Sequence, residues 1–215
     1  MTEQPAKKAG HRLEWLVWSA LGITVIVIAV AFLRERLRDR VLEERLQLAL
    51  PVPDFTLTNQ FAQPVSLTNL LGQVWVADVI FTTCPMSCEQ MTRRMHVIEQ
   101  QISDDAPVKF ISITAYPQQD SPPVLRRYAE QRGLDQSRWH FLTGLKSNVY
   151  DLSVHGMKFA VLENTNRVIP EDLFIHSTHF ALVDKRGNIR GVFEGTDEKD
   201  RSQLLLAVKK LVRER

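Results

Sequence analysis

The sequence predicts an α/β layer fold preceded by one N-terminal transmembrane helix. Three observations support this prediction. Residues 15–33 form an uncharged run, WLVWSALGITVIVIAVAFL. Beyond it, apolar strand-like segments alternate with helix-like segments, and a hairpin and a last helix close the chain. The chain has only two cysteines, Cys84 and Cys88, and they stand where the most apolar strand gives way to a helix.

Composition limits the class of protein. A chain of 215 residues is long enough for one well-buried domain with some length left over. The formal net charge is +2, and no basic stripe is interleaved with aromatic residues, so we expect no nucleic-acid partner. Two cysteines are too few for a disulfide framework or for a closed four-thiolate zinc site.

The uncharged run 15–33 is long enough to cross a membrane. As a helix it spans about 28 Å at ~1.5 Å per residue, against ~30 Å for a bilayer core. Trp15 and Trp18 stand at its N-terminal end, where interfacial aromatics are favoured. A buried core helix is disfavoured because the run has no polar face. A cleaved signal peptide is the closer alternative, because Ala29-Val30-Ala31 resembles a cleavage site, but the apolar run continues past it. An uncleaved anchor is therefore the preferred interpretation.

The charges beside the anchor give no firm orientation. Three basic residues precede the run, and five arginines follow it: Arg34, Arg36, Arg38, Arg40 and Arg45. By the positive-inside count alone, the C-terminal side would be cytoplasmic. Large domains can be translocated despite such charges, so this count stands as an objection to an outward-facing domain and does not decide the question.

The chain divides into four parts. We expect an N-terminal tail (1–14), a transmembrane anchor (15–33), a helical stalk (34–50) and a folded domain (51–215). The stalk has apolar positions spaced along one side of a charged helix, and Pro51 and Pro53 are expected to end it.

The elements of the domain follow from hydrophobic period and turn residues. Residues 74–81 are nearly all apolar, which predicts a strand buried on both faces and hence central in the sheet. Asp120 or Ser121 can cap a helix that ends at Gly133, and Thr196 or Asp197 can cap the last one. We expect 155–175 to be irregular. The other predicted strands are 54–58, 65–67, 108–114, 139–142, 176–184 and 189–194, and the other helices follow the cysteines to about residue 102 and cover 148–154. This order is that of a thioredoxin-like fold.

The two cysteines fall at the start of a helix. Pro85 suits the first helical position, which puts Cys84 at or beside the N-cap and Cys88 one turn in. The same helix face continues with Met91, Met95 and Ile98, so we expect it to point into the protein. A helix N-terminus favours anions, so one or both thiols should ionise more easily than a free cysteine.

This spacing leaves three interpretations open: a disulfide, coordination of a soft metal ion, or inert buried thiols. A third group would discriminate between them. His176 and His179 open the strand before the hairpin, and two thiolates with one imidazole suit Cu(I) and can also take Cu(II). Residues three apart on a strand face opposite sides, so only one histidine is expected to be a ligand, and periodicity does not say which.

The sequence resembles the Sco/SenC family of membrane-anchored, thioredoxin-like copper proteins. The matching residues are the anchor, Pro53-Asp54-Phe55-Thr56-Leu57, the run Phe81 to Cys88, and His176-Ser177-Thr178-His179-Phe180-Ala181-Leu182-Val183-Asp184. The resemblance implies that Cys84, Cys88 and His176 are the metal ligands and that His179 is not. The chain departs from the family by having Met86 and Ser87 where an acidic residue is usual, and Glu89 where proline is usual.

The resemblance implies a copper chaperone for assembly of the copper centre of cytochrome c oxidase. Its partner would be the copper-accepting subunit of the oxidase. It would be a carrier and not a turnover enzyme. We expect a single-pass protein of the inner (cytoplasmic) membrane, with its domain on the periplasmic, outer face.

Two other activities are weighed against the copper carrier. A membrane-anchored thiol-disulfide oxidoreductase would keep oxidase or other exported cysteines reduced, with Cys84 attacking its exchange partner and Cys88 resolving. A peroxidase is disfavoured, because the arginines it would need, Arg93 and Arg94, come five residues or more past Cys88.

Overall fold

The computed structural model describes the chain except residues 1–9, 85–86, 160–161, 164–173, 176 and 215. The chain forms two compact units, residues 1–44 and 45–215, which are described separately. The limits predicted for the tail, anchor, stalk and domain stay predictions.

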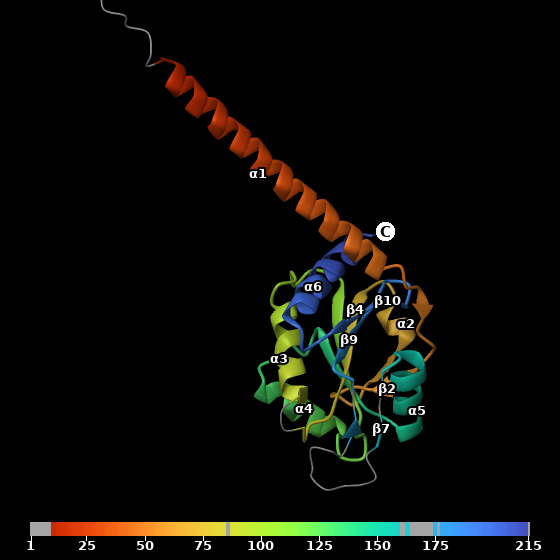
Figure 1. The fold of residues 1–215 in the computed structure, drawn as a ribbon. Coiled ribbons are helices and arrows are strands. Elements are labelled where there is room, and N and C mark those ends of the chain that lie inside the picture. Colours follow the sequence, from red (N-terminus) through yellow and green to blue (C-terminus); the bar gives the residue numbers. More distant parts are fainter. Residues whose placement is uncertain (1–9, 85–86, 160–161, 164–173, 176, 215) are drawn as a thin grey trace, which may run out of the picture. The chain divides into compact units, whose positions relative to one another are not determined.

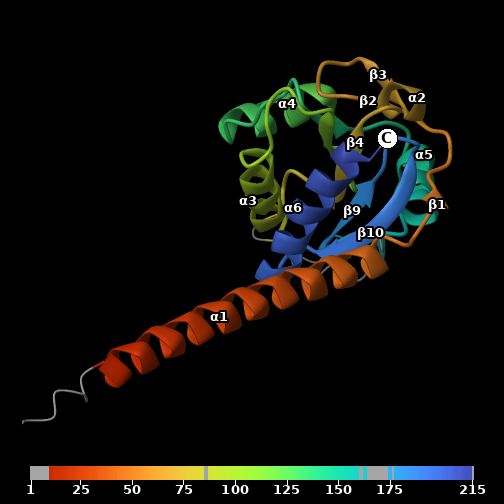
Figure 2. The same cartoon turned by 90° about the horizontal axis from the view of Figure 1, so that it is seen from above.

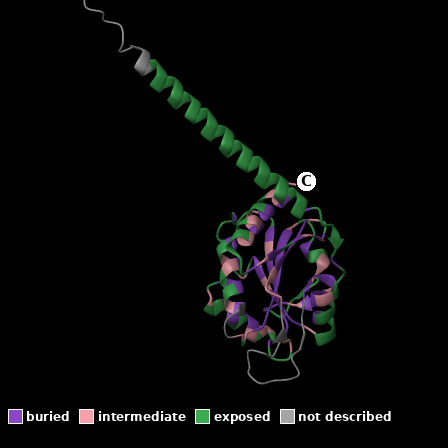
Figure 3. Ribbon diagram, viewed as in Figure 1, coloured by how far each residue is buried: buried purple, intermediate pink, exposed green. Residues whose placement is uncertain are grey.

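The first unit consists of one long helix. Helix α1 (Gly10–Arg45) runs without interruption through the uncharged stretch (Figure 1). Its apolar window has a mean hydropathy of 2.6 and none of it is buried inside the protein. Figure 3 draws most of this helix in the colour of exposed residues. By length and composition, α1 can therefore cross a membrane. The helix ends at Arg45, before the two prolines expected to end it.

The second unit is built on a six-stranded sheet. Its order is β1-β10-β9-β4-β5-β6, with β4, β5 and β6 parallel and β9 antiparallel to both β4 and β10. All seven residues of β4 are buried, as its apolar run predicts. Figure 3 shows the strands as the buried centre of this unit. The strands are β1 (Leu50–Pro51), β4 (Val74–Ile80), β5 (Val108–Thr114), β6 (Trp139–Leu142), β9 (His179–Val183) and β10 (Asn188–Glu194).

Helices cover both faces of the sheet. Helices α3 (Ser87–Glu99), α4 (Pro122–Gln131) and α6 (Glu198–Arg213) lie on one face, and α2 (Leu67–Leu70) and α5 (Lys146–Tyr150) lie on the other (Figures 1 and 2). The strand order β5-β4-β9-β10, with α3 and α6 packed together, is the thioredoxin-like core. The predicted fold class is thus confirmed.

Some local expectations are wrong. The segment expected to be irregular contains a short antiparallel pair, β7 (Leu162–Glu163) with β8 (Phe174–Ile175). The expected helix 148–154 is divided between α5 and a π-helical turn, Asp151–Gly156. At the end of this turn, a Cβ on Gly156 would lie 3.1 Å from Pro53 and from Leu152, so a larger residue would be crowded there. The hairpin β2 (Thr56–Thr58) with β3 (Pro64–Ser66) pairs as expected.

The ends of α4 and α6 agree with the predicted capping residues, except at the N-terminus of α4. Asp197 caps α6 by accepting a hydrogen bond from the Asp200 N–H at 2.8 Å. Gly133 follows α4 in the left-handed conformation, with φ +62°. At the other end of α4, Ser121 occupies the N-cap without a side-chain hydrogen bond. The carboxylate of Asp120, the other cap candidate, is engaged elsewhere, near the cysteines.

Candidate metal site

The cysteine loop, residues 81–88, leaves the buried end of β4. Phe81 is fully buried, and its carbonyl accepts a hydrogen bond from the Cys84 N–H at 3.2 Å. Helix α3 is described from Ser87 onward, and Pro85, the predicted first helical residue, lies outside the described residues. Cys84 therefore precedes the helix, and Cys88 lies in its first turn.

The two thiols lie next to each other. The Cys88 N–H donates a hydrogen bond to Cys84 Sγ at 3.3 Å. Both cysteines are reduced; Cys84 is half-buried and Cys88 is 1% exposed. A backbone N–H at a helix start stabilises a sulfur anion through its partial positive charge. This contact therefore favours negative charge on Cys84.

Cys88 departs from the expectation that the helix start eases ionisation. Its side-chain hydrogen bond with Cys84 and its burial raise the pKa of the Cys88 thiol well above the usual range. Burial disfavours the charged form, and a second negative sulfur alongside disfavours it further. Cys84 is thus the more accessible of the two thiols, and the protonated form of Cys88 is favoured.

Helix α3 presents its apolar stripe to the interior, as predicted. Met91 and Met95 are fully buried and Ile98 is 1% exposed. A hydroxyl–hydroxyl hydrogen bond of 2.9 Å between Thr92 and Tyr128 also joins α3 to α4. The helix that carries Cys88 is therefore held along its length, which fixes the position of the buried thiol.

Asp120 supports the cysteine loop, a role that the sequence analysis missed. Its Oδ2 accepts hydrogen bonds from the Thr82 N–H at 3.1 Å and from the Thr114 hydroxyl at 2.5 Å, and its Oδ1 accepts from the Thr82 hydroxyl at 2.5 Å. Asp120 is fully buried. Its carboxylate joins the segment before Cys84 to the end of β5. The separation of 38 residues from Thr82 leaves no periodic signal in the sequence.

The start of β9 lies beside the cysteine loop. Strand β9 runs antiparallel to β4, so its first residues lie near the end of β4 from which the loop leaves. His179 is the first residue of β9. Its Nδ1 shares a hydrogen bond with the Ser177 hydroxyl at 3.0 Å, and its Nε2 is 3.4 Å from Glu194 Oε2. Both ring nitrogens are engaged within the protein.

The third predicted ligand, His176, lies outside the described residues. The structure thus brings Cys84 and Cys88 together and leaves His176 a prediction. Among the residues that the structure describes, no group of three or more histidine, cysteine and carboxylate side chains forms a metal site. The two sulfurs are nonetheless the soft donors that copper prefers, and they are adjacent and reduced.

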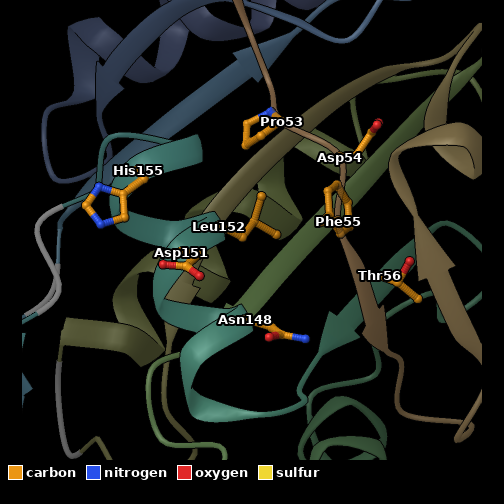
Figure 4. A pocket seen from close by; sticks show the side chains of 8 residues that line it. All are labelled: Pro53, Asp54, Phe55, Thr56, Asn148, Asp151, Leu152 and His155. Carbon is orange, nitrogen blue, oxygen red and sulfur yellow. The ribbon is translucent and has the colours of Figure 1, made fainter.

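A separate cavity lies away from the thiols. It has a volume of about 410 Å³ and lies between residues 53–56 and the helical segment 148–155 (Figure 4). Its titratable lining residues are Asp54, Asp151 and His155, and all three are exposed. Neither cysteine lines it, so it is not part of the candidate metal site.

The fold and the thiols together define a class of protein. A reduced C-x3-C pair, placed where the central strand of a thioredoxin-like sheet passes into a helix, belongs to a thioredoxin-like dithiol protein. The SCO1/SenC family model matches residues 44–213. The chain belongs to this family, as its sequence motifs predict.

Individual relatives agree with this assignment. The SCO1 protein homolog of Bacillus subtilis is 31% identical over 160 residues, which cover 74% of this chain and 81% of the relative. A putative copper-binding protein of Stutzerimonas stutzeri is 27% identical over 188 residues, or 81% of this chain and 88% of the relative. The structure of BsSco, described as a member of the Sco family of cytochrome c oxidase assembly proteins with a disulfide switch, has a TM-score of 0.68 and 30% identity. The alignment covers 78% of this chain and 96% of BsSco.

Proposed function

We propose that this chain is a membrane-anchored copper chaperone that delivers copper to cytochrome c oxidase. Copper is its cargo, and Cys84, Cys88 and His176 are its ligands. The observation that carries the proposal is the pair of reduced, adjacent sulfurs at the start of α3. Family membership and the copper-binding relative support it.

The chemistry of the two sulfurs suits a carrier. Thiolates are soft ligands that favour Cu(I), and a set of three ligands leaves a coordination position for an incoming ligand. Cys84 is partly exposed, so an acceptor's sulfur can approach from its side. Copper can then pass by exchange of one ligand at a time. Such a transfer changes no covalent bond of the protein and needs no turnover chemistry.

The proposed partner is the copper-accepting subunit of cytochrome c oxidase. BsSco is described as belonging to a family of cytochrome c oxidase assembly proteins, which supports an oxidase partner for this chain. The apolar helix α1 supports single-pass anchoring. We place the anchor in the inner (cytoplasmic) membrane and the domain on the periplasmic face, where it would meet an exported acceptor.

A second candidate function, thiol-disulfide exchange, is favoured by the unequal exposure of the thiols. The Cys84 thiolate would attack a substrate disulfide, form a mixed disulfide and release one substrate thiolate. The Cys88 sulfur would lose its proton and attack Cys84 Sγ, which releases the second substrate thiolate. Two electrons leave the protein, and a separate dithiol reductant would reset the Cys84–Cys88 disulfide. The disulfide switch described for BsSco supports this alternative.

Replacing His176 by alanine is expected to separate the two functions. Loss of a partner that only orients a ligand costs about 10- to 100-fold in metal affinity, so loss of the ligand itself should weaken Cu(I) binding at least about 100-fold. The reduction of a disulfide substrate should be largely retained, because it needs only the thiols. Copper affinity is measured by competition with a Cu(I) chelator, using the full chain in detergent.

The matched control for this test is His179→Ala, which removes the neighbouring histidine. It should keep Cu(I) affinity within about threefold, because both nitrogens of His179 are engaged with Ser177 and Glu194. Unchanged affinity in His176→Ala, or a large loss confined to His179→Ala, would remove His176 from the proposed ligand set. Loss of disulfide reduction in His176→Ala would argue against a purely dithiol mechanism for the alternative.

A further inference from the structure

Three exposed arginines directly follow the apolar run of α1. Arg34, Arg36 and Arg38 lie where α1 continues past Leu33, and all three are exposed. At ~1.5 Å per residue, they stand about 1.5–7.5 Å beyond the end of the run along the helix axis. The headgroup layer on each side of a bilayer core is about 5–8 Å thick. With the predicted span 15–33 in the membrane, the three residues therefore fall at the level of the lipid headgroups. We name them the arginine collar.

The side chain of Arg36 turns back toward the apolar run. Its guanidinium carbon lies 4.9 Å from the centre of the Phe32 ring, four residues earlier in the helix. Long side chains on a helix lean toward its N-terminus, and the face of an aromatic ring attracts a guanidinium group. Phe32 belongs to the uncharged run. This contact therefore holds a positive charge at the end of the run.

The charges of the collar are not neutralised within the described part of the chain. There, none of the three guanidinium groups forms an ion pair, and this includes pairs with Glu35 and Asp39, the acidic residues of the same stretch. No acidic residue stands three or four positions from Arg34, the spacing at which side chains of a helix meet. Its neighbour at this spacing is Arg38, and like charges so placed repel each other. An anion bound between these two arginines would relieve the repulsion.

We propose that the arginine collar binds the phosphate groups of anionic phospholipids. A guanidinium group can donate two parallel hydrogen bonds to phosphate oxygens. In a zwitterionic headgroup an ammonium group neutralises the phosphate and repels arginine, so an anionic lipid is favoured. A lipid also places its chains beside the apolar run, which a soluble phosphate cannot do. The proposal depends on the depth of the collar in the membrane and holds for either orientation of the chain. It rests on the proposed single-pass anchoring and is independent of the copper ligands.

Co-purification of lipid with the full chain tests the proposal. The protein in detergent is mixed with equal amounts of phosphatidylglycerol and phosphatidylcholine and repurified, and the retained lipids are quantified by mass spectrometry. Each basic residue at an anionic membrane surface strengthens binding about fivefold, so the wild type should retain phosphatidylglycerol at least about tenfold over phosphatidylcholine. The triple variant Arg34→Gln/Arg36→Gln/Arg38→Gln should retain the two lipids within about twofold of each other.

The matched control is Arg40→Gln, on the same helix. Arg40 is also exposed, but it stands about 10 Å beyond Leu33, past the headgroup layer, and Glu43 and Glu44 follow it by three and four positions. Its replacement should change the lipid ratio less than about twofold, whereas Arg34→Gln alone should lower the ratio at least about threefold. A wild-type ratio in the triple variant, or equal losses from Arg40→Gln and Arg34→Gln, would overturn the collar.

Salt gives a second readout that needs no variant. The screening length falls from ~10 Å at 0.1 M salt to ~3 Å at 1 M, so the lipid ratio of the wild type should fall at least about threefold over this range. A ratio that salt leaves unchanged would contradict an electrostatic collar.

Flotation with phosphatidylcholine vesicles separates this inference from the proposed function. The wild type and the triple variant should both float, because the apolar run alone anchors them. Failure of both to float would overturn the anchoring and the collar together. Flotation of both without a preference for phosphatidylglycerol would overturn the collar alone, and the anchor and the copper site would stand.

Discussion

Serine at position 84 or 88 is expected to abolish stoichiometric copper binding. A serine hydroxyl stays protonated at neutral pH and is a hard donor, so either substitution removes one of two adjacent soft ligands. The effect should exceed that of His176→Ala, because the two sulfurs supply the thiolate character on which Cu(I) binding depends. Copper content per protein after loading and desalting measures it, using the full chain in detergent.

The matched control is Thr83→Ala, which changes an exposed residue of the same loop. It should retain full copper content. The two serine variants should also differ in stability, because Cys84 is half-buried while Cys88 is 1% exposed. A hydroxyl at position 88 replaces a buried thiol, and its burial costs about 1–3 kcal/mol where it finds no partner. Stoichiometric copper in Cys84→Ser would exclude the dithiolate site.

Asp120→Ala is expected to cause the largest loss of stability among single changes near the site. It removes an acceptor from the Thr82 N–H and from the hydroxyls of Thr82 and Thr114. Each buried group left without a partner costs about 1–3 kcal/mol, so the free energy of unfolding should fall by about 3 kcal/mol or more. For a domain of this size, the melting temperature should fall by about 6–12 °C.

Circular dichroism of the full chain during heating measures this change. Asp151→Ala is the control, because Asp151 is exposed on the opposite face of the sheet and should shift the melting temperature by less than about 2 °C. Asp120→Asn keeps the size and one acceptor oxygen, so its loss should be intermediate. A melting temperature for Asp120→Ala equal to that of Asp151→Ala would show that the three hydrogen bonds contribute nothing measurable.

The parts of the site that the sequence predicted correctly come from local patterns. The apolar run 74–81 forms the buried strand β4, between β5 and β9, because a strand covered on both faces needs apolar residues at successive positions. The stripe Met91, Met95 and Ile98 is buried because helical spacing repeats on one face. Both patterns lie within one element, so the sequence alone contains them.

The parts that the sequence did not reveal depend on distant contacts. Asp120 matched a helix cap locally, yet its carboxylate serves Thr82, 38 residues earlier. Nothing in the sequence near Arg94 indicates that its side chain contacts Gly195, which lies 101 residues further along the chain. The hydrogen bond with Cys84 and the burial that raise the pKa of Cys88 likewise do not follow from its place at a helix N-terminus. Hydrogen bonds across such separations leave no periodicity to detect.

The antiparallel pairing of β4 with β9 has a consequence for how the protein is made. The cysteine loop is synthesised long before the strand that completes the sheet beside it, since Arg94 and its partner Gly195 are 101 residues apart. At 5–20 residues per second, this interval lasts roughly 5–20 s. For most of it the nascent chain holds both thiols without β9, β10 or α6 around them. The redox state of the two thiols during synthesis therefore depends on the surroundings of the growing chain and not on its fold.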